Sequence, residues 1–165
     1  ISPFRYVLLP LSLQACACGF LYEDGNSPNQ CTCSAAQIRR YQNKLSGPIM
    51  DRIDINLEIK RLDEDQLLKY GDGESSEVIR NRVEEARKAQ QKRGKTNSNL
   101  TSKDLKKYCK LNNSSRQILK MASRNLGLSG RGYNKTLKIA RTIADLDGMD
   151  EIGKKHIVEA VSYRS

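Results

Sequence analysis

The chain has 165 residues, of which 38% are hydrophobic and none is Trp, so it is long enough for one domain, or a small domain plus part of another. Its formal net charge of +10 indicates a polyanionic partner, either nucleic acid or nucleotide phosphate. The apolar run at residues 6–13 is too short to cross a bilayer, and no positively charged leader or small-residue cleavage site accompanies it. We therefore expect a cytoplasmic protein that has no membrane partner.

Two segments within the first sixty residues have the pattern of strands. Residues 4–14 form an apolar run interrupted by Pro10, and residues 53–59 alternate apolar with polar side chains. Between these segments, Ser34 is placed to cap a helix over residues 35–45. The first part of the chain, up to residue 60, is therefore predicted to contain about two strands.

A linker is expected over residues 61–74, which are acidic and contain glycines. After it, the hydrophobic spacing is helical throughout, so residues 75–165 are predicted to form an all-helical bundle. The predicted helices cover residues 76–92, capped by Ser75 or Ser76, and a short segment from 102, which a capping box at Thr101 and Asp104 opens. Further helices are predicted over residues 113–126, 130–146 and 154–163. In the first helix, the residues predicted to face the core are Val78, Ile79, Val83 and Ala86. The fold as a whole is predicted to be mainly α.

Four of the five cysteines form two close pairs, Cys16 with Cys18 and Cys31 with Cys33. The short loop between the pairs allows four thiolates to surround a tetrahedral zinc ion. The spacing within each pair is CxC, which is less common at zinc sites than CxxC, so two disulfides or reduced thiols are the alternatives. A reducing cytoplasm favours zinc or free thiols. The fifth cysteine, Cys109, falls in a helical pattern and is expected to pack as a small hydrophobic residue.

Arg52 follows a Gly-Pro break and directly precedes the alternating segment. An arginine held at the edge of a strand is able to reach out of its own subunit, and its planar guanidinium suits a phosphate on a neighbour. The alternative is a surface ion pair between Arg52 and Asp51 or Asp54, which the spacing alone favours.

Arg131 lies between two glycines at the start of a predicted helix, where free backbone N–H groups favour an anion. Arg141 follows nearly three turns later, either on the same face or paired with Asp145 at i+4. Around both arginines, residues 80–141 contain eighteen Lys and Arg against three acids. This excess indicates a nucleic-acid or nucleotide partner, and a solvated helical surface is the alternative.

The order in which short motifs follow one another along the chain is also informative. The chain contains CxCG, then CxCSxxQIxxY, LSGP with DRIDI, GESS with an arginine-rich stretch, LSxRGY with ARTIADLxG, and a final YR. This order resembles the C-terminal third of the magnesium-chelatase-like AAA+ ATPases, and the resemblance covers residues 16–164. It implies the end of an α/β AAA+ core in residues 1–60, as a C-terminal remnant of about two strands, followed by an all-helical lid in residues 75–165.

The resemblance also implies roles for individual residues. Arg52 stands at the position of the arginine finger, which reaches the γ-phosphate of ATP on the next subunit. Arg131 stands at the sensor-2 position of the lid, with Arg141 as a further nucleotide-binding candidate. Gln14 stands where relatives carry the sensor-1 asparagine, so it is a degenerate sensor 1. The four cysteines become a structural insertion after the sensor-1 strand.

The family is associated with hexameric ring ATPases that drive branch migration of DNA during uptake and recombination. The resemblance therefore implies ATP and Mg²⁺ as cofactors, other AAA+ subunits and DNA as partners, and zinc as a structural ion. Because the chain contains neither a Walker A nor a Walker B motif, we expect no ATP hydrolysis by this chain alone. The alternatives are a stand-alone basic helical module that binds nucleic acid or protein, and a remnant without function.

Overall fold

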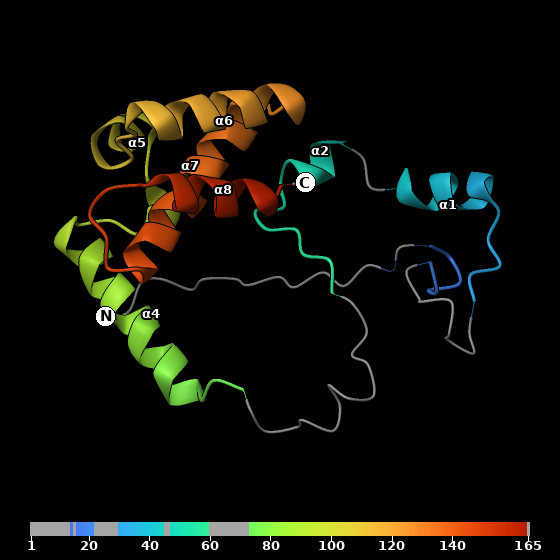
Figure 1. Ribbon diagram of the computed structural model, residues 1–165, viewed down its shortest axis with the longest axis horizontal. Coiled ribbons are helices and arrows are strands. Elements are labelled where there is room, and N and C mark those ends of the chain that lie inside the picture. Colours follow the sequence, from blue (N-terminus) through green and yellow to red (C-terminus); the bar gives the residue numbers. More distant parts are fainter. Residues whose placement is uncertain (1–13, 15, 22–29, 45–46, 60–72, 165) are drawn as a thin grey trace. The chain divides into compact units, whose positions relative to one another are not determined.

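The structure is a computed structural model that describes residues 14, 16–21, 30–44, 47–59 and 73–164 (Figure 1). These residues form seven α-helices and one 3₁₀ helix, and no strand is present among them. The chain divides into two compact units, Ile1–Ser46 and Gly47–Ser165. The prediction of a mainly α fold is therefore confirmed. The predicted linker falls largely on residues outside the described ranges.

The strand predicted over residues 53–59 is not formed. These residues are irregular, and the backbone N–H of Asn56 donates to the carbonyl of Tyr163 at 3.0 Å. Alternating side chains produce a strand only where a neighbouring strand supplies a ladder, and the described residues offer none. Ile55 and Leu57 consequently remain 50% and 62% exposed. The other predicted strand, residues 4–14, lies outside the described residues except for its last position.

The first unit contains one described helix, α1 (Ala35–Gln42), which starts where the sequence predicted. The Ser34 hydroxyl accepts from the backbone N–H of Gln37 at 3.3 Å, and the Gln37 side chain accepts from the backbone N–H of Ser34 at 2.8 Å. This reciprocal capping box satisfies two N–H groups that lack helical partners. The helix ends at Gln42, three residues before the predicted end.

The second unit is a bundle of helices, and two of them, α4 and α5, begin at predicted caps. Its elements are α2 (Gly47–Met50), α4 (Ser76–Lys92), η1 (Asn97–Asn99), α5 (Ser102–Tyr108), α6 (Asn113–Asn125), α7 (Gly130–Leu146) and α8 (Lys154–Ser162). Side chains that accept a hydrogen bond from the first helical turn belong to Ser75, Thr101, Asn112 and Ser129. None of the helices in the described part of the chain is long and apolar enough to cross a membrane.

The core of the bundle surrounds α7. This helix contacts α4, α5, α8 and η1, and α6 packs on α8 (Figure 1). The buried apolar residues are Leu100, Leu105, Cys109, Leu119, Leu137, Ala140, Ile143, Ala144, Ile152, Ile157 and Ala160. Cys109 therefore packs in the core, as its position in a helical pattern predicted.

The apolar face predicted for α4 is buried only in its second half. Ala86 is 2% exposed, whereas Val78, Ile79 and Val83 are 50%, 41% and 42% exposed. Figure 1 shows the reason, because the first turns of α4 extend beyond the bundle and only the later turns lie against it. The prediction that the three earlier residues face the core is therefore wrong for the described residues.

A buried carboxylate, Asp145 on α7, joins three elements of the bundle. Its side chain is 0% exposed. It accepts from Arg141 Nε at 3.1 Å, from Asn97 Nδ2 at 2.7 Å and from the guanidinium of Arg93. Arg93 follows α4 and Asn97 begins η1, so one carboxylate fixes both segments against α7. Two cations and an amide around a buried acid satisfy its charge and its lone pairs.

We predict that Asp145→Asn destabilises the bundle strongly, because two guanidinium groups lose their carboxylate partner. Removing one member of a buried ion pair typically costs about 3–5 kcal/mol. Urea unfolding followed by circular dichroism measures the loss. The matched control is Glu85→Gln, which removes an exposed ion pair with Lys88 and is expected to leave the midpoint unchanged. An unchanged midpoint for Asp145→Asn would contradict the role assigned to this carboxylate.

Candidate functional site

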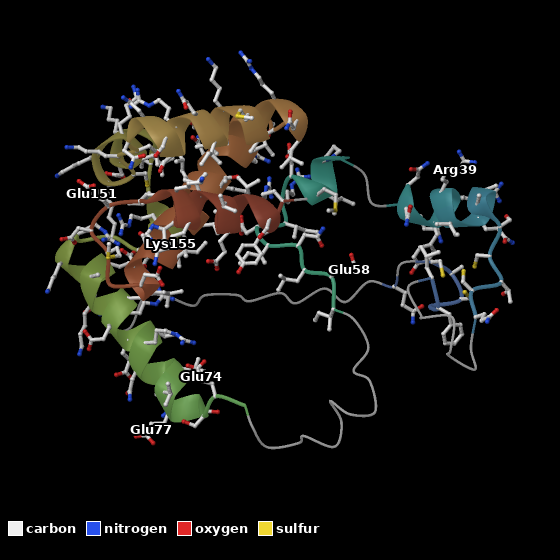
Figure 2. The ribbon with its side chains drawn as sticks, viewed as in Figure 1. Arg39, Glu58, Glu74, Glu77, Glu151 and Lys155 are labelled. Atoms are coloured by element: carbon white, nitrogen blue, oxygen red, sulfur yellow. The ribbon has the colours of Figure 1, made fainter. Side chains whose placement is uncertain are left out.

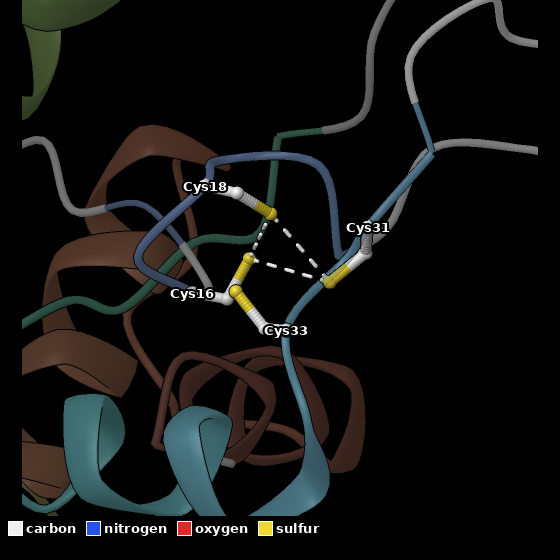
Figure 3. A group of neighbouring side chains, drawn as sticks. All are labelled: Cys16, Cys18, Cys31 and Cys33. Atoms are coloured by element: carbon white, nitrogen blue, oxygen red, sulfur yellow. Dashed lines mark hydrogen bonds between the residues drawn. The ribbon is translucent and has the colours of Figure 1, made fainter.

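The four cysteines of the first unit converge on one point (Figure 3). Their sulfur atoms all lie within 4.8 Å of one another, and the thiols are free. The Sγ–Sγ distances are 3.3 Å for Cys16–Cys18, 3.7 Å for Cys16–Cys31 and 3.6 Å for Cys18–Cys31, with Cys33 as the fourth member. Sulfurs bound to tetrahedral zinc at about 2.3 Å lie about 3.8 Å apart, so the donor set fits a zinc ion.

Local structure on each side of the cluster determines where the thiols lie. The first pair stands on a turn in which the Gly19 N–H donates to the Cys16 carbonyl at 3.2 Å. Gly19 has φ +87°, a conformation that favours glycine. The second pair directly precedes Ser34, whose capping box fixes the start of α1. A turn and a helix cap thus position the two pairs.

Gln14, the predicted sensor 1, lies against this turn. A Cβ atom placed on Gly19 would be 3.2 Å from the Gln14 side chain. Gln14 is exposed, and its contact with Gly19 makes it a neighbour of the cysteine cluster. Its role as sensor 1 stays a prediction.

Contact between the thiols separates their pKa values. The pKa of Cys18 is lowered to about 6, chiefly by the backbone N–H of Phe20 and then by the thiol of Cys16. For Cys31, the backbone N–H of Cys33 lowers the pKa, but desolvation and the neighbouring thiols outweigh it and raise the pKa to about 12. Cys18 therefore forms a thiolate readily at neutral pH, whereas a metal ion has to displace the proton of Cys31.

Arg52 lies two residues after the end of α2 and is exposed. Its guanidinium donates to a backbone carbonyl one turn earlier at 3.2 Å. The neighbouring acids have other partners, because Asp54 pairs with Lys135 at 2.8 Å and Asp51 lies 3.9 Å from Arg164. The alternative ion pair between Arg52 and these acids is thus absent from the described residues, and the guanidinium remains accessible to an anion.

The other two predicted arginines differ in their surroundings. Arg131 is exposed in the first turn of α7, and no ion pair or side-chain hydrogen bond is seen for it within the described ranges. Arg141 is 1% exposed and pairs with Asp145, the alternative that the i+4 spacing offered. It also donates to two carbonyls in the turn after α7, one of them that of Asp150 at 2.6 Å. Arg141 thus stabilises the end of α7, and its nucleotide contact stays a prediction.

In the described part of the chain, some cations of the basic block pair with an acid, and others are exposed and have no acidic partner. Residues 102–129 contain seven Lys and Arg and a single acid, Asp104, which pairs with Lys95 at 2.8 Å. The seven cations, all exposed, are Lys103, Lys106, Lys107, Lys110, Arg116, Lys120 and Arg124. Figure 2 shows nitrogen-tipped side chains pointing outward along α5 and α6. We call these seven residues the α5–α6 basic surface; the sequence indicated it only as part of a longer excess of charge.

Two further cations were not singled out by sequence reasoning. Lys135 on α7 and Arg164 after α8 both contact the segment that carries Arg52. Arg164 was visible only as the end of the final YR motif, and Lys135 only as one charge of the basic block. No spacing rule links either residue to a partner more than eighty positions away, so the sequence carried no signal for these contacts.

Comparison with known proteins identifies the class to which this fold and these motifs belong. Residues 73–164 match the family model described as magnesium chelatase, subunit ChlI C-terminal, and residues 3–67 match magnesium chelatase, subunit ChlI. The first match alone covers more than half of the chain. The chain therefore belongs to the magnesium chelatase ChlI-like family, as its motifs predicted.

Individual relatives are similar over most of this chain. Competence protein ComM of Haemophilus influenzae is 44% identical over 134 residues, which are 80% of this chain and 26% of ComM. YifB of Escherichia coli is 43% identical over 139 residues, which are 83% of this chain and 28% of YifB. A Mycobacterium tuberculosis protein is 33% identical over 167 residues, 98% of this chain and 32% of its own length. The chain thus spans about a quarter to a third of the length of these relatives.

We predict that the cysteine cluster binds one tetrahedral metal ion. Co²⁺ titration should produce thiolate charge-transfer bands that Zn²⁺ abolishes, and Cys33→Ser should weaken binding because one ligand is lost. Cys109→Ala is the matched control, since it removes a thiol from the core and leaves the cluster intact.

Affinity should fall as the pH is lowered from 7.5 to 5.5, because Cys18, with its pKa of about 6, then also binds a proton. Equal affinity for Cys33→Ser and the wild type would argue against four-thiol ligation.

Proposed function

We propose that this chain forms the end of the ATPase core and the helical lid of a ComM-like AAA+ ATPase that acts on DNA. Arg52 is its arginine finger, and Arg131 is its sensor-2 arginine. The observation that supports this proposal best is the accessible guanidinium of Arg52, whose neighbouring acids are engaged by Lys135 and Arg164.

A ring of subunits gives such an arginine a chemical role. In phosphoryl transfer, negative charge spreads over the oxygens of the transferred group, and a guanidinium from the next subunit stabilises that charge. Arg131 lies at the start of the seventeen-residue helix α7, where the positive end of the helix dipole favours the same anion. ATP and Mg²⁺ would be held chiefly by Walker motifs, which these 165 residues do not contain. The chain thus acts on ATP as part of a larger assembly.

The α5–α6 basic surface supports DNA as a partner. Seven exposed cations and one paired acid produce a positive potential that attracts a phosphate backbone without regard to sequence. The competing function is a basic helical module that binds nucleic acid or protein without catalysis. A module of this kind would also bind its partner through this surface, but it would not need Arg52 or Arg131. Variants of these two arginines therefore distinguish the two proposed functions.

We assign a structural role to the cysteine cluster. Four thiolates complete a tetrahedral zinc site and leave no open position for water or substrate. The ion would join the turn at Gly19 to the segment that precedes α1. Reduced thiols that bind zinc are the usual state in the cytoplasm, where we place the protein.

We predict that Arg52→Ala and Arg131→Ala abolish ATP hydrolysis in a full-length relative that carries this chain in place of its own C-terminal segment. Loss of an arginine finger typically lowers kcat by about 10³-fold or more. The matched control is Arg82→Ala, which removes an exposed arginine on α4 that pairs with Glu74.

Mixed rings refine this test. Subunits with Arg52→Ala should regain activity when combined with subunits that lack the Walker A lysine, because the latter supply the finger to the intact ATP site of their neighbours. Unchanged turnover of Arg52→Ala rings would refute the finger assignment.

We predict that the chain binds duplex DNA and that affinity falls steeply with salt. Replacing Lys106 and Lys110 by Ala should reduce the slope of log K against log salt by about 2, one unit for each lost phosphate contact. The slope is measured by fluorescence anisotropy between 50 and 200 mM salt, because phosphate contacts weaken strongly with salt over this range. The matched control replaces Arg80 and Lys92 on α4 by Ala. If no binding is detectable at low salt, the nucleic-acid proposal fails.

A further inference from the structure

The loop that carries Arg52 is irregular, yet it is held firmly on one side by α7. Lys135 Nζ donates to the carbonyl of Arg52 at 2.7 Å and pairs with Asp54 Oδ1 at 2.8 Å. One ammonium group therefore bonds to the chain on both sides of Ile53. This contact joins positions more than eighty residues apart in the sequence.

The end of α8 holds the same loop. Arg164 donates to the carbonyl of Ile53 at 2.6 Å and approaches Asp51 to 3.9 Å. The backbone N–H of Asn56 donates to the carbonyl of Tyr163 at 3.0 Å. Figure 1 shows the end of α8 close to the segment that follows α2, in agreement with these bonds. Residues 51–56 are therefore attached to two helices of the bundle.

The bonds from the cations to carbonyls dominate this attachment. The Lys135 and Arg164 side chains are 19% and 7% exposed, whereas Asp54 and Asp51 are 69% and 41% exposed. Exposed ion pairs contribute little because water and salt screen them. Hydrogen bonds from partly buried charged donors are stronger, and breaking them leaves a charge without a partner.

These contacts fix the backbone of Arg52 while its tip stays accessible. Its N–H donates to the carbonyl of Ile49 at 2.9 Å, and its carbonyl accepts from Lys135. The guanidinium is exposed and bonds only to the carbonyl of Pro48 among the described residues, at 3.2 Å. A fixed base and an accessible tip are what an arginine needs in order to meet a phosphate in a defined position.

The same two cations connect this loop to Arg131. Lys135 follows Arg131 by four residues, a rise of about 6 Å along α7. The Nη2 atom of Arg164 lies 3.1 Å from the position that a Cβ on Gly132 would occupy, so Arg164 also packs against the first turn of α7. Gly132 permits this close approach because it has no side chain.

We propose that Lys135 and Arg164 are positioning residues that join the Arg52 loop to α7, so that Arg52 and Arg131 move as one body. When nucleotide bound to one subunit reorients its helical bundle, the finger that this subunit presents to its neighbour moves with the bundle. The consequence for ATP hydrolysis rests on the proposed function, whereas the attachment of the loop does not.

The attachment is tested on this chain by ¹⁵N relaxation and amide hydrogen exchange. In the wild type, residues 51–56 should have order parameters of about 0.85, typical of rigid backbone. Lys135→Ala and Arg164→Ala should lower these values below about 0.6 and speed exchange of the Asn56 amide at least about 10-fold, with α4 to α8 unchanged. The matched control is Lys138→Ala, whose ammonium donates to the carbonyl of Ser98 instead. Equal mobility of the loop in the wild type and both variants would overturn the proposal.

The consequence for catalysis is tested in the full-length ring that carries this chain. Lys135→Ala and Arg164→Ala should lower kcat by about 10- to 100-fold with little change in KM, because a misplaced finger affects turnover more than ATP binding. Lys135→Arg, which keeps a charged donor, should recover most of the activity.

If Arg52→Ala abolishes turnover while the Lys135 and Arg164 variants are fully active, the positioning role is refuted. If Arg52→Ala has no effect on turnover, the proposed function fails instead, and the relaxation data alone decide whether the loop is attached.

Discussion

The helical bundle depends on the buried carboxylate of Asp145. It accepts hydrogen bonds from Arg93 and Asn97, which lie at the end of α4 and the start of η1, and from Arg141 on its own helix. A buried acid is stable only when cations and hydrogen-bond donors satisfy its charge and lone pairs, so the arrangement permits little variation in how these segments meet. The orientation of α7 follows from it, and α7 in turn carries Arg131 and Lys135.

Cations on this chain serve three physical purposes. Arg93 and Arg141 are partly or fully buried and bond to Asp145, so they stabilise the bundle. Lys135 and Arg164 bond to backbone carbonyls and hold the Arg52 loop. The α5–α6 basic surface and Arg131 face solvent, where anionic partners are accessible. The net charge of the chain counts all three groups of cations together. Only the contacts of each side chain show to which group it belongs.

Features that depend on neighbouring residues in the sequence were predicted well. The caps at Ser34, Ser75 and Thr101 lie within three residues of the groups they bond, so the sequence indicates where these helices begin. The cysteine spacing likewise predicted one cluster of thiols. In contrast, the strand over residues 53–59 needed a partner strand, and the inward face of Val78 needed a packing partner. The sequence specifies neither partner, and the described structure supplies neither.

The sequence by itself determined the family, the helices and their caps, and the residues at the motif positions, because each of these is encoded in short runs of consecutive or regularly spaced residues. Only the tertiary structure decided which charges are buried and which are exposed. It paired Arg141 with Asp145, left Arg52 and Arg131 accessible, and attached the Arg52 loop through Lys135 and Arg164. The physical reason is that burial and ion pairing depend on residues brought together across long stretches of chain, and local sequence patterns do not encode those distances.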